Sequence, residues 1–231
     1  SRCACAQDGT IGKSPHYRQD IREIRNLASR VQGEKHPLFA VRDVDRPGAK
    51  VLLIVVTADK GLCGAFNTNL IKLVGQQIAA FPQRQHVMSL VGRKGRDFFR
   101  RRGAACRFEL IGIFNDVKFA HAQEIARDAI EAFVSGEVDA VDLVYNEFKS
   151  AIQQRPIVER VLPIPRLPEE EIPAGPIDYL YEPEPEKIFD TLLPNYVAFD
   201  IYHALLESVA AEHGARMTAM APGRVSTPIT R

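Results

Sequence analysis

The chain has 231 residues, of which 45% are hydrophobic and 26% are charged. This length allows a full hydrophobic core, so the expected organisation is one α/β domain with an appendage. The formal net charge of +1 argues against a protein that binds nucleic acid or a membrane surface through a strong field. The four cysteines are scattered, which argues against a disulfide framework and favours a reducing compartment. No apolar run reaches the ~18 residues that a bilayer-spanning helix needs.

Residues 1–35 begin irregularly and then become helical. From Tyr17 to Val31, apolar residues recur at spacings of three and four, as on one face of an α-helix. Gly33 is a suitable end for this helix, and Pro37 prevents it from resuming. We interpret this segment as a terminal helix that precedes the domain.

Residues 36–165 carry the pattern of an α/β domain, in which strands alternate with helices. Residues 51–56 form an unbroken aliphatic run, typical of a strand covered on both faces of a parallel sheet. Further strands are predicted at 87–91, 108–113, 138–148 and, at a sheet edge, 157–164, with helices at 67–81, 94–102 and 121–133. The predicted fold class is therefore α/β, with a Rossmann-like, doubly wound and mostly parallel sheet and right-handed crossovers.

Residues 186–220 form the most informative helix, about 50 Å long at about 1.5 Å per residue. Apolar residues and histidines follow a heptad seam through Phe189, Leu192, Tyr196, Phe199, His203, Leu206, Ala210, His213, Met217 and Met220. A second stripe lies beside it and contains Leu193, Val197, Ile201, Leu205 and Val209. Two stripes require two partners, which we expect to be the α/β domain and another long helix of a coiled-coil shaft. Pro194 predicts a kink, and Pro222 ends the helix before an irregular tail at 221–231.

Residues 166–185 are a linker rich in proline and glutamate. Such a composition cannot form a core, so the segment is expected to cross the surface. Near its end, Tyr179, Tyr181 and Glu182 combine aromatic rings with a carboxylate. This combination is suited either to contact with a partner or to attachment of the linker to its own domain.

The turn from Gly61 to Gly64 lies between the predicted buried strand and a helix, where a nucleotide could bind. The sequence there lacks the three-glycine dinucleotide fingerprint and the Gly-Lys-Ser/Thr of a phosphate-binding loop. Cys63 could be a nucleophile, although no His/Asp pair lies near it in the sequence. A tight structural turn with a small buried cysteine is the favoured interpretation. The alternative is a small-molecule or nucleotide-binding α/β enzyme that uses this turn and Cys63.

Residues 93–102 contain six basic residues and two phenylalanines. Such a segment can bind nucleic acid through its phosphates. The balanced total charge favours another arrangement, in which Phe98 and Phe99 face the sheet and the arginines lie in solvent. The Cys3/Cys5 pair lacks zinc-ligand spacing and the histidines are dispersed, so neither a metal nor a cofactor is predicted.

Several separated stretches point to one family. They are, in order, His36-Pro37, Arg42-Asp43-Val44, Asp59-Lys60-Gly61-Leu62-Cys63-Gly64, Tyr179-Leu180-Tyr181-Glu182-Pro183, Leu192-Leu193 and Ala215-Arg216-Met217-Thr218-Ala219-Met220. In order and spacing they resemble the gamma subunit of F-type ATP synthase, over about residues 14–220. The last stretch is the most specific of them.

The resemblance implies an α/β domain carrying an antiparallel pair of terminal helices. This shaft would pass up the axis of a ring of alpha and beta subunits, while the foot sits on the membrane rotor. Tyr179, Tyr181 and Glu182 would contact the c-ring and the epsilon-type subunit. The shaft residues on the C-terminal helix would be Leu206, Glu207, Glu212, His213, Arg216, Met217 and Met220. Asp59, Gly61, Cys63 and Gly64 would be a family-marker turn with little chemistry.

The implied function is mechanical and not catalytic. The subunit would couple proton-driven rotation to ATP synthesis at the beta-subunit sites by rigid-body rotation. It would reach the membrane only through the rotor complex, at the cytoplasmic face of a bacterial plasma membrane in preference to the mitochondrial inner membrane, and it would bind no nucleic acid. Because the family's two shaft helices continue further, we expect that the chain is truncated at both ends of the coiled coil and that residues 1–35 are a remnant of the first helix.

Overall fold

The computed structural model describes residues 36–165 and 185–220. Its centre is one five-stranded sheet with the strand order β3-β2-β1-β4-β5. The strands are β1 (Lys50–Val56), β2 (Gln85–Val91), β3 (Cys106–Leu110), β4 (Ala140–Ser150) and β5 (Gln153–Leu162). The strands β1 to β4 are parallel, and β5 is antiparallel to β4. The prediction of a mostly parallel α/β sheet is confirmed.

The order of the strands creates one special position at the carboxyl edge of the sheet. From β1 the chain proceeds outward to β2 and β3, and it then returns to place β4 on the other side of β1. The connections on the two sides of β1 therefore diverge between β1 and β4. In doubly wound sheets this switch point opens a crevice outside the carboxyl ends of the strands.

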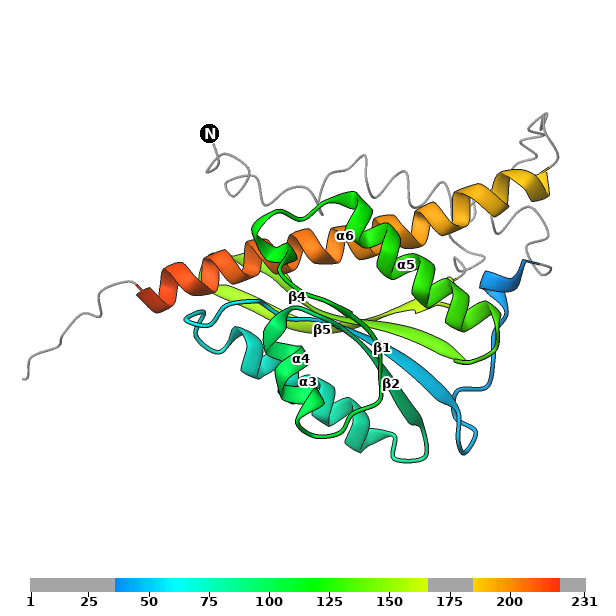
Figure 1. Ribbon diagram of the computed structural model, residues 1–231, viewed down its shortest axis with the longest axis horizontal. Helices are drawn as coiled ribbons and strands as arrows, with labels where there is room; N and C mark the ends of the chain where they lie inside the picture. The colour runs from blue at the N-terminus through cyan, green and yellow to red at the C-terminus, as the bar shows by residue number, and fades with distance from the viewer. Residues whose placement is uncertain (1–35, 166–184, 221–231) are drawn as a thin grey trace, which may run out of the picture.

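Among the residues that the structure describes, two helices cover each face of the sheet (Figure 1). The short 3-10 helices in this part of the chain are η2 (Pro37–Phe39) and η3 (Ile113–Asn115). On one face α3 (Phe66–Ala80) and α4 (Arg93–Arg100) pack against Val51, Leu53 and Val55. On the other face α5 (Phe119–Val134) and α6 (Pro185–Met220) pack against Leu52, Ile54 and Val56. The strand β1 thus contributes to two cores, because successive side chains point to opposite faces.

The elements differ from the sequence prediction mainly at two ends. The third strand was predicted to reach residue 113, but it ends at Leu110 because Gly112 adopts a positive φ of 82°. The last strand was predicted to begin at residue 157, but β5 begins at Gln153 and forms a hairpin with β4. The first residues of β5 are polar and are followed by Pro156, so their sequence resembles a loop. An edge strand can nevertheless contain a proline, which cannot donate a hydrogen bond to the ladder.

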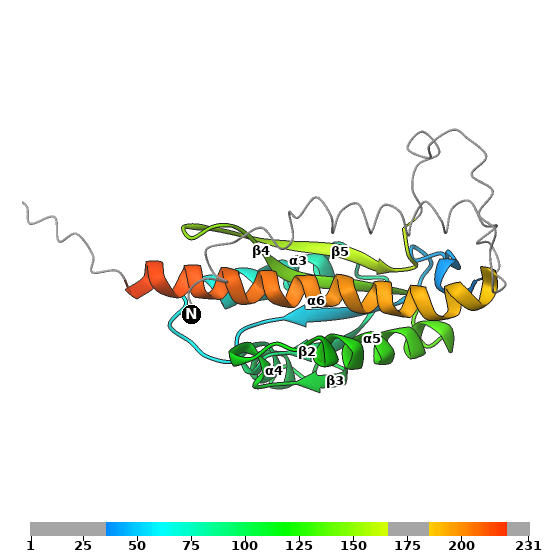
Figure 2. The ribbon, with the colours of Figure 1, turned by 90° about the horizontal axis from the view of Figure 1, so that it is seen from above.

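The helix α6 runs along the length of the domain (Figure 2). The predicted second stripe packs on the domain, since Leu193, Val197, Ile201 and Leu205 are each 0% exposed. The heptad seam is more open, although Tyr196 within it is only 1% exposed. Phe199, Met217 and Met220 are 48%, 70% and 61% exposed. The prediction that one stripe packs on the α/β domain is confirmed, and the long helical partner of the other stripe stays a prediction.

The helix α6 continues through Pro194. Whether the helix axis bends there, as predicted, stays a prediction. The predicted helix from Tyr17 to Val31, the linker and the tail at 221–231 lie outside the described residues. Within residues 36–165 and 185–220, none of the helices combines the length and apolarity that crossing a bilayer takes.

Adjacent leucines on α6 test which stripe holds the helix. Leu205, in the second stripe, is fully buried, whereas Leu206, in the heptad seam, is only partly buried. We expect Leu205→Ala to lower the free energy of unfolding by about 3 kcal/mol, because it leaves a cavity in the core. The control Leu206→Ala is expected to cost about 1 kcal/mol or less. Urea unfolding followed by circular dichroism measures both, and equal losses would contradict this assignment of the stripes.

Candidate functional site

The turn at residues 57–64 and the end of α6 meet at the switch-point crevice. Ala58, Cys63 and Phe66 come from the turn and the start of α3, and all three are buried. They form one apolar cluster with two small residues of α6, Ala211 and Ala215. We call this contact the α6 junction. The helix of the protein's own chain therefore fills much of the crevice in which doubly wound sheets hold a ligand.

The tip of the β4–β5 hairpin contacts the last turns of α6. A Cβ atom added to Gly214 would lie 3.0 Å from the carbonyl oxygen of Ala151. The Thr218 hydroxyl lies 3.1 Å from the same oxygen and 3.0 Å from that of Gly214, and it donates to these carbonyls. Small residues on α6 thus allow helix and hairpin backbones to approach closely, and a side-chain hydrogen bond fixes their register.

Asp59 organises the loops at the same edge of the sheet. Its carboxylate accepts hydrogen bonds from the backbone amides of Gly112 at 2.8 Å, Arg93 at 3.1 Å and Phe114 at 3.2 Å. These amides lie in the connections that follow β2 and β3. Clustered backbone amides of this kind can bind an anion, and here the anion is an internal carboxylate.

Thr57 joins the turn to the start of α4. Its hydroxyl donates to the carbonyl of Val91 at 3.0 Å and accepts from the amide of Gly95 at 2.8 Å. A Cβ at Gly92 would lie 1.8 Å from the carbonyl oxygen of Thr57. Glycine is required at position 92 because its backbone is in contact with that of Thr57. The backbone of Thr57 therefore occupies the space at the start of α4.

Cys63 has the surroundings of a packing residue. It is 2% exposed, and its sulfur accepts a hydrogen bond from Asn67 Nδ2 at 3.2 Å. Burial raises the pKa of the thiol, and the nearby carboxylate of Glu212 raises it further. A raised pKa disfavours the thiolate, which is the reactive form. The interpretation of a small buried residue is confirmed, and the physical basis for a nucleophile at this position is weak.

The predicted shaft residues divide into two groups. Glu207 accepts a hydrogen bond from the amide of Phe148 in β4 at 2.7 Å, and Glu212, 6% exposed, pairs with Arg216. These three residues bind α6 to its own domain or stabilise it internally. Leu206, His213, Met217 and Met220 belong to the more open seam. Tyr179, Tyr181 and Glu182 lie outside the described residues.

The basic segment at 93–102 lies on α4 and the turn that follows it. Phe99 is buried, and Phe98 packs against the same core. Arg100, Arg101 and Arg102 are exposed, and the guanidinium of Arg102 lies 3.6 Å from the centre of the Phe98 ring. The expected arrangement, with aromatics on the sheet and arginines in solvent, is confirmed.

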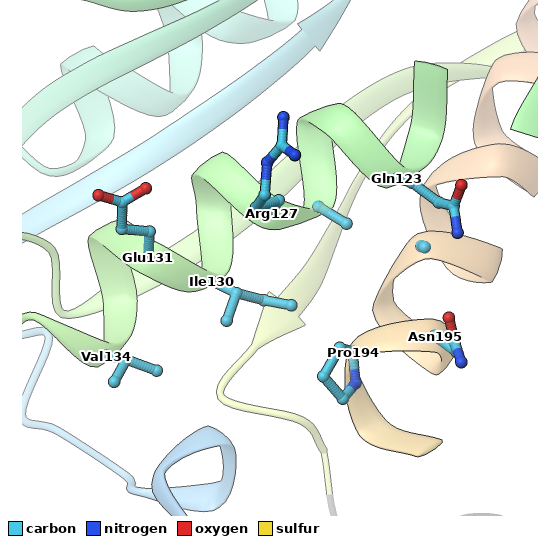
Figure 3. A pocket seen from close by; sticks show the side chains of 9 residues that line it. Gln123, Arg127, Ile130, Glu131, Val134, Pro194 and Asn195 are labelled. Atoms are coloured by element: carbon cyan, nitrogen blue, oxygen red, sulfur yellow. The ribbon is translucent and has the colours of Figure 1, made fainter. Parts of the chain in front are cut away.

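A groove of about 440 Å³ lies between α5 and α6. Figure 3 shows Ile130 and Pro194 extending toward each other across it, with Arg127 and Glu131 on the α5 side. The charged groups of the lining are the Arg127 guanidinium and the Glu131 carboxylate. No serine, cysteine or threonine lines this groove as a candidate nucleophile. The α6 junction is therefore the stronger candidate for a functional site.

Sequence reasoning found the turn and the helix but not the contacts between them. The spacing of Ala211, Gly214, Ala215 and Thr218 is a signal that could have been used, since small residues three or four apart mark a close helix contact. The three amide partners of Asp59 leave no such signal, because they follow it by 34 to 55 residues.

Fold and site together define a class of protein, an α/β domain that carries a long helix across its switch-point crevice. The family model described as ATP synthase matches residues 2–223. The ATP synthase gamma chain of Solibacter usitatus is 46% identical over 219 residues, covering 93% of this chain and 74% of the relative. That of Moorella thermoacetica is 43% identical over 219 residues, covering 93% and 73%. The chain belongs to the ATP synthase gamma chain family.

A solved structure has the same fold. The cryo-EM structure of the central stalk and c-ring of the Tetrahymena thermophila mitochondrial ATP synthase contains a chain that aligns with a TM-score of 0.60. The alignment covers 94% of this chain and 96% of that chain at 22% sequence identity. At this level of identity the similarity establishes the fold alone.

The carboxylate of Asp59 can be tested by an isosteric change. Asp59→Asn leaves one acceptor oxygen and places an amide donor among three backbone N–H groups. We expect a loss of about 2 kcal/mol in the free energy of unfolding, since hydrogen bonds to a charged acceptor are among the stronger ones. The control Asp116→Asn, whose side chain is 75% exposed in the neighbouring loop, should change stability by about 0.5 kcal/mol or less. Indistinguishable denaturation midpoints would contradict the role of Asp59.

Glu207 predicts a pH dependence. Although its burial raises the pKa, hydrogen bonds from His203 and the Phe148 amide outweigh this effect and lower it below the ordinary value of 4.5. The carboxylate therefore contributes stability above about pH 4.5 that is lost as the pH falls through the lower folded pKa. Relative to Glu207→Gln, the wild-type chain should lose more stability between pH 6 and pH 3 in thermal unfolding. Parallel pH profiles would show that Glu207 does not anchor α6 electrostatically.

Proposed function

We propose that this chain is the central-stalk subunit of an F-type ATP synthase, coupling proton-driven rotation of the membrane rotor to ATP synthesis on the beta subunits. The observation that carries the proposal is the double character of α6. One stripe is buried on the domain, as at Leu205 with 0% exposure, and the other is open toward the end of the helix, as at Met217 with 70% exposure. A helix fixed along one side and open along the other can receive force through its open side and transmit it to the domain.

The proposed partners are the alpha and beta subunits, the epsilon-type subunit and the c-ring. The similar solved structure is described as a central stalk with its c-ring, which supports the rotor partner. The open seam supports an association of α6 with a second long helix. Within the shaft, we assign Leu206, His213, Met217 and Met220 to that association. Glu207, Glu212 and Arg216 hold the helix in place.

We further propose that the subunit is not itself catalytic. The support comes from the α6 junction, where Ala211 and Ala215 pack against the turn and the pKa of the Cys63 thiol is raised by burial. Catalysis is assigned to the beta subunits, and the role of this chain is to force them through different conformations by rotation. It requires no cofactor of its own.

The proposed organisation follows the sequence divisions. Residues 1–35 belong to a shaft helix, 36–165 form the α/β domain, 166–185 the foot contact and 186–220 the second shaft helix, before a tail at 221–231. A gamma chain is a peripheral subunit of a membrane-associated complex. The relatives from Solibacter usitatus and Moorella thermoacetica are bacterial, which supports the cytoplasmic face of a bacterial plasma membrane.

The foot contact is tested by binding to purified c-ring and epsilon-type subunit. The double variant Tyr181→Ala/Glu182→Gln should weaken binding at least about tenfold, because a buried aromatic anchor and a hydrogen-bonded charge are each worth roughly 2 kcal/mol at an interface. Tyr179→Ala should also weaken it. The control Glu170→Gln alters the same linker away from the proposed contact and should bind as the wild-type chain does. Unchanged affinity of the double variant, measured by surface plasmon resonance, would refute the assignment of the foot.

A further inference from the structure

A small cavity lies beside the α6 junction, near the last residues of α6. It has a volume of about 200 Å³ and lies between the start of α3, the strand β4, the β4–β5 hairpin and the end of α6. Thr218 and Ala219 line it, and α6 ends at the next residue, Met220. The chain therefore leaves the helix immediately beside this cavity.

The lining of the cavity suits an apolar occupant better than a charged one. None of the described residues that line it has a charged side chain. Two of its polar side chains already use their donors within the protein. Gln154 Nε2 donates to the carbonyls of Ser150 and Ala151, and the Thr218 hydroxyl donates to those of Ala151 and Gly214. Much of the remaining lining comes from the apolar side chains of Ala65, Phe66, Ile152, Ala215 and Ala219.

Large apolar side chains are exposed around the same end of α6. Ile152 at the hairpin tip is 82% exposed, Leu62 in the turn is 75% exposed, and Met220 is 61% exposed. A Cβ atom added to Gly64 would lie 3.9 Å from the Cβ of Ala219, so the turn adjoins the last residues of the helix as the hairpin does. Exposed apolar surface that gathers in one place marks a site of contact with another segment.

The segment that follows α6 in the chain has a sequence that suits this surface. Residues 221–231 lie outside the described residues. They begin with Ala221-Pro222-Gly223-Arg224, and proline followed by glycine at the two central positions is typical of a type II β-turn, which reverses the chain. The next residue is the apolar Val225. The five residues from Met220 can span up to about 18 Å, so Val225 can reach the cavity that Ala219 lines.

Arg224 provides an electrostatic reason for the same reversal. The last four carbonyls of a helix have no intrahelical donor, and the helix dipole places partial negative charge there. The last turn of α6 contains no basic residue. A turn at residues 221–224 brings the Arg224 guanidinium back toward these carbonyls, where a cation is stabilising.

We propose that residues 221–231 fold back on the end of α6 and that the Val225 side chain occupies the cavity, in contact with Ile152 at the hairpin tip. The partner of this surface is thus a segment of the same chain. Docking removes the Val225 and Ile152 side chains from water, which favours the folded-back arrangement, and it strengthens the attachment of α6 to the hairpin. The inference does not depend on the proposed rotor function, since it concerns contacts within this chain alone.

Disulfide trapping tests the proximity of the two segments. In a full chain whose cysteines other than Cys63 are replaced by serine, the pair Ile152→Cys/Val225→Cys is oxidised with glutathione. A disulfide requires Cα atoms within about 7 Å of each other, so docking should make the intramolecular bond form at least about tenfold faster than in the control pair Val41→Cys/Val225→Cys. Val41 is the matched position because it is 82% exposed, as Ile152 is. It lies in the segment between η2 and β1, at the opposite end of the domain (Figure 1).

Hydrogen exchange of the chain with its native cysteines gives a second readout. Val225→Asp would place a charge in a cavity that offers it no charged partner. We therefore expect the amides of residues 151–154 and 215–220 to exchange at least about fivefold faster than in the wild-type chain, because the docked segment no longer protects them. Val225→Ile keeps an apolar side chain and should exchange as the wild-type chain does. Val41→Asp, which adds the same charge at the opposite end, should also leave these amides unchanged.

Three outcomes would overturn the proposal. The first is an equal rate of oxidation for the two cysteine pairs, and the second is unchanged exchange in Val225→Asp. The third is a disulfide found only in covalent dimers by mass spectrometry, because the occupant of the cavity would then be a second copy of the chain.

Discussion

The packing of α6 against the carboxyl edge of the sheet is the contact on which the rest of the structure depends. A doubly wound sheet necessarily leaves a crevice where the connections diverge, and most such domains use it for a ligand. Here the helix enters it with small side chains, Ala211 and Ala215, which lie against Cys63 and Phe66. Gly214 also lets the helix approach the Ala151 carbonyl closely. The feature that makes the fold a nucleotide-binding scaffold elsewhere therefore makes it a holder for a helix here.

Two partly buried carboxylates, Asp59 and Glu207, provide a second kind of contact within the chain. Asp59 collects backbone amides from two connections, and Glu207 accepts the amide of Phe148 across the boundary between helix and sheet. A charge-assisted bond to a backbone amide is directional and stronger than a neutral one. Burial of the apolar stripe of α6 stabilises the contact with the domain but does not depend on direction. The hydrogen bonds to these carboxylates are directional, so they fix the orientation of the helix and the loops. Both are required if the helix is to keep one rotational setting on the domain under load.

The parts of this structure that were predictable are those written in local patterns. The aliphatic run of β1 predicted a central strand, and the second stripe of α6 predicted its buried side. The predicted last strand was too short, because Pro156 and the polar residues before it resemble a loop in the sequence. They become part of β5 only through pairing with β4. The contacts that Glu207 and Glu212 make within the chain could not be predicted for a related reason. Their partners lie in β4 or on the same helix, and helical periodicity does not distinguish an exposed carboxylate from one that binds its own domain.

The distribution of contacts along α6 determines how it can transmit force. Near the start of α6, Asp190 Oδ1 lies 3.4 Å from His36 Nε2. Near its end, the Thr218 hydroxyl donates to the Ala151 carbonyl. Between them the stripe from Leu193 to Leu205 is continuously buried. At about 1.5 Å per residue, these attachments are spread over roughly 40 Å. A twisting force applied to the open seam is therefore resisted by many contacts at once, so that the domain turns with the helix as one body. A helix attached at a single point would instead bend or unwind locally, because separate short segments of helix are only marginally stable.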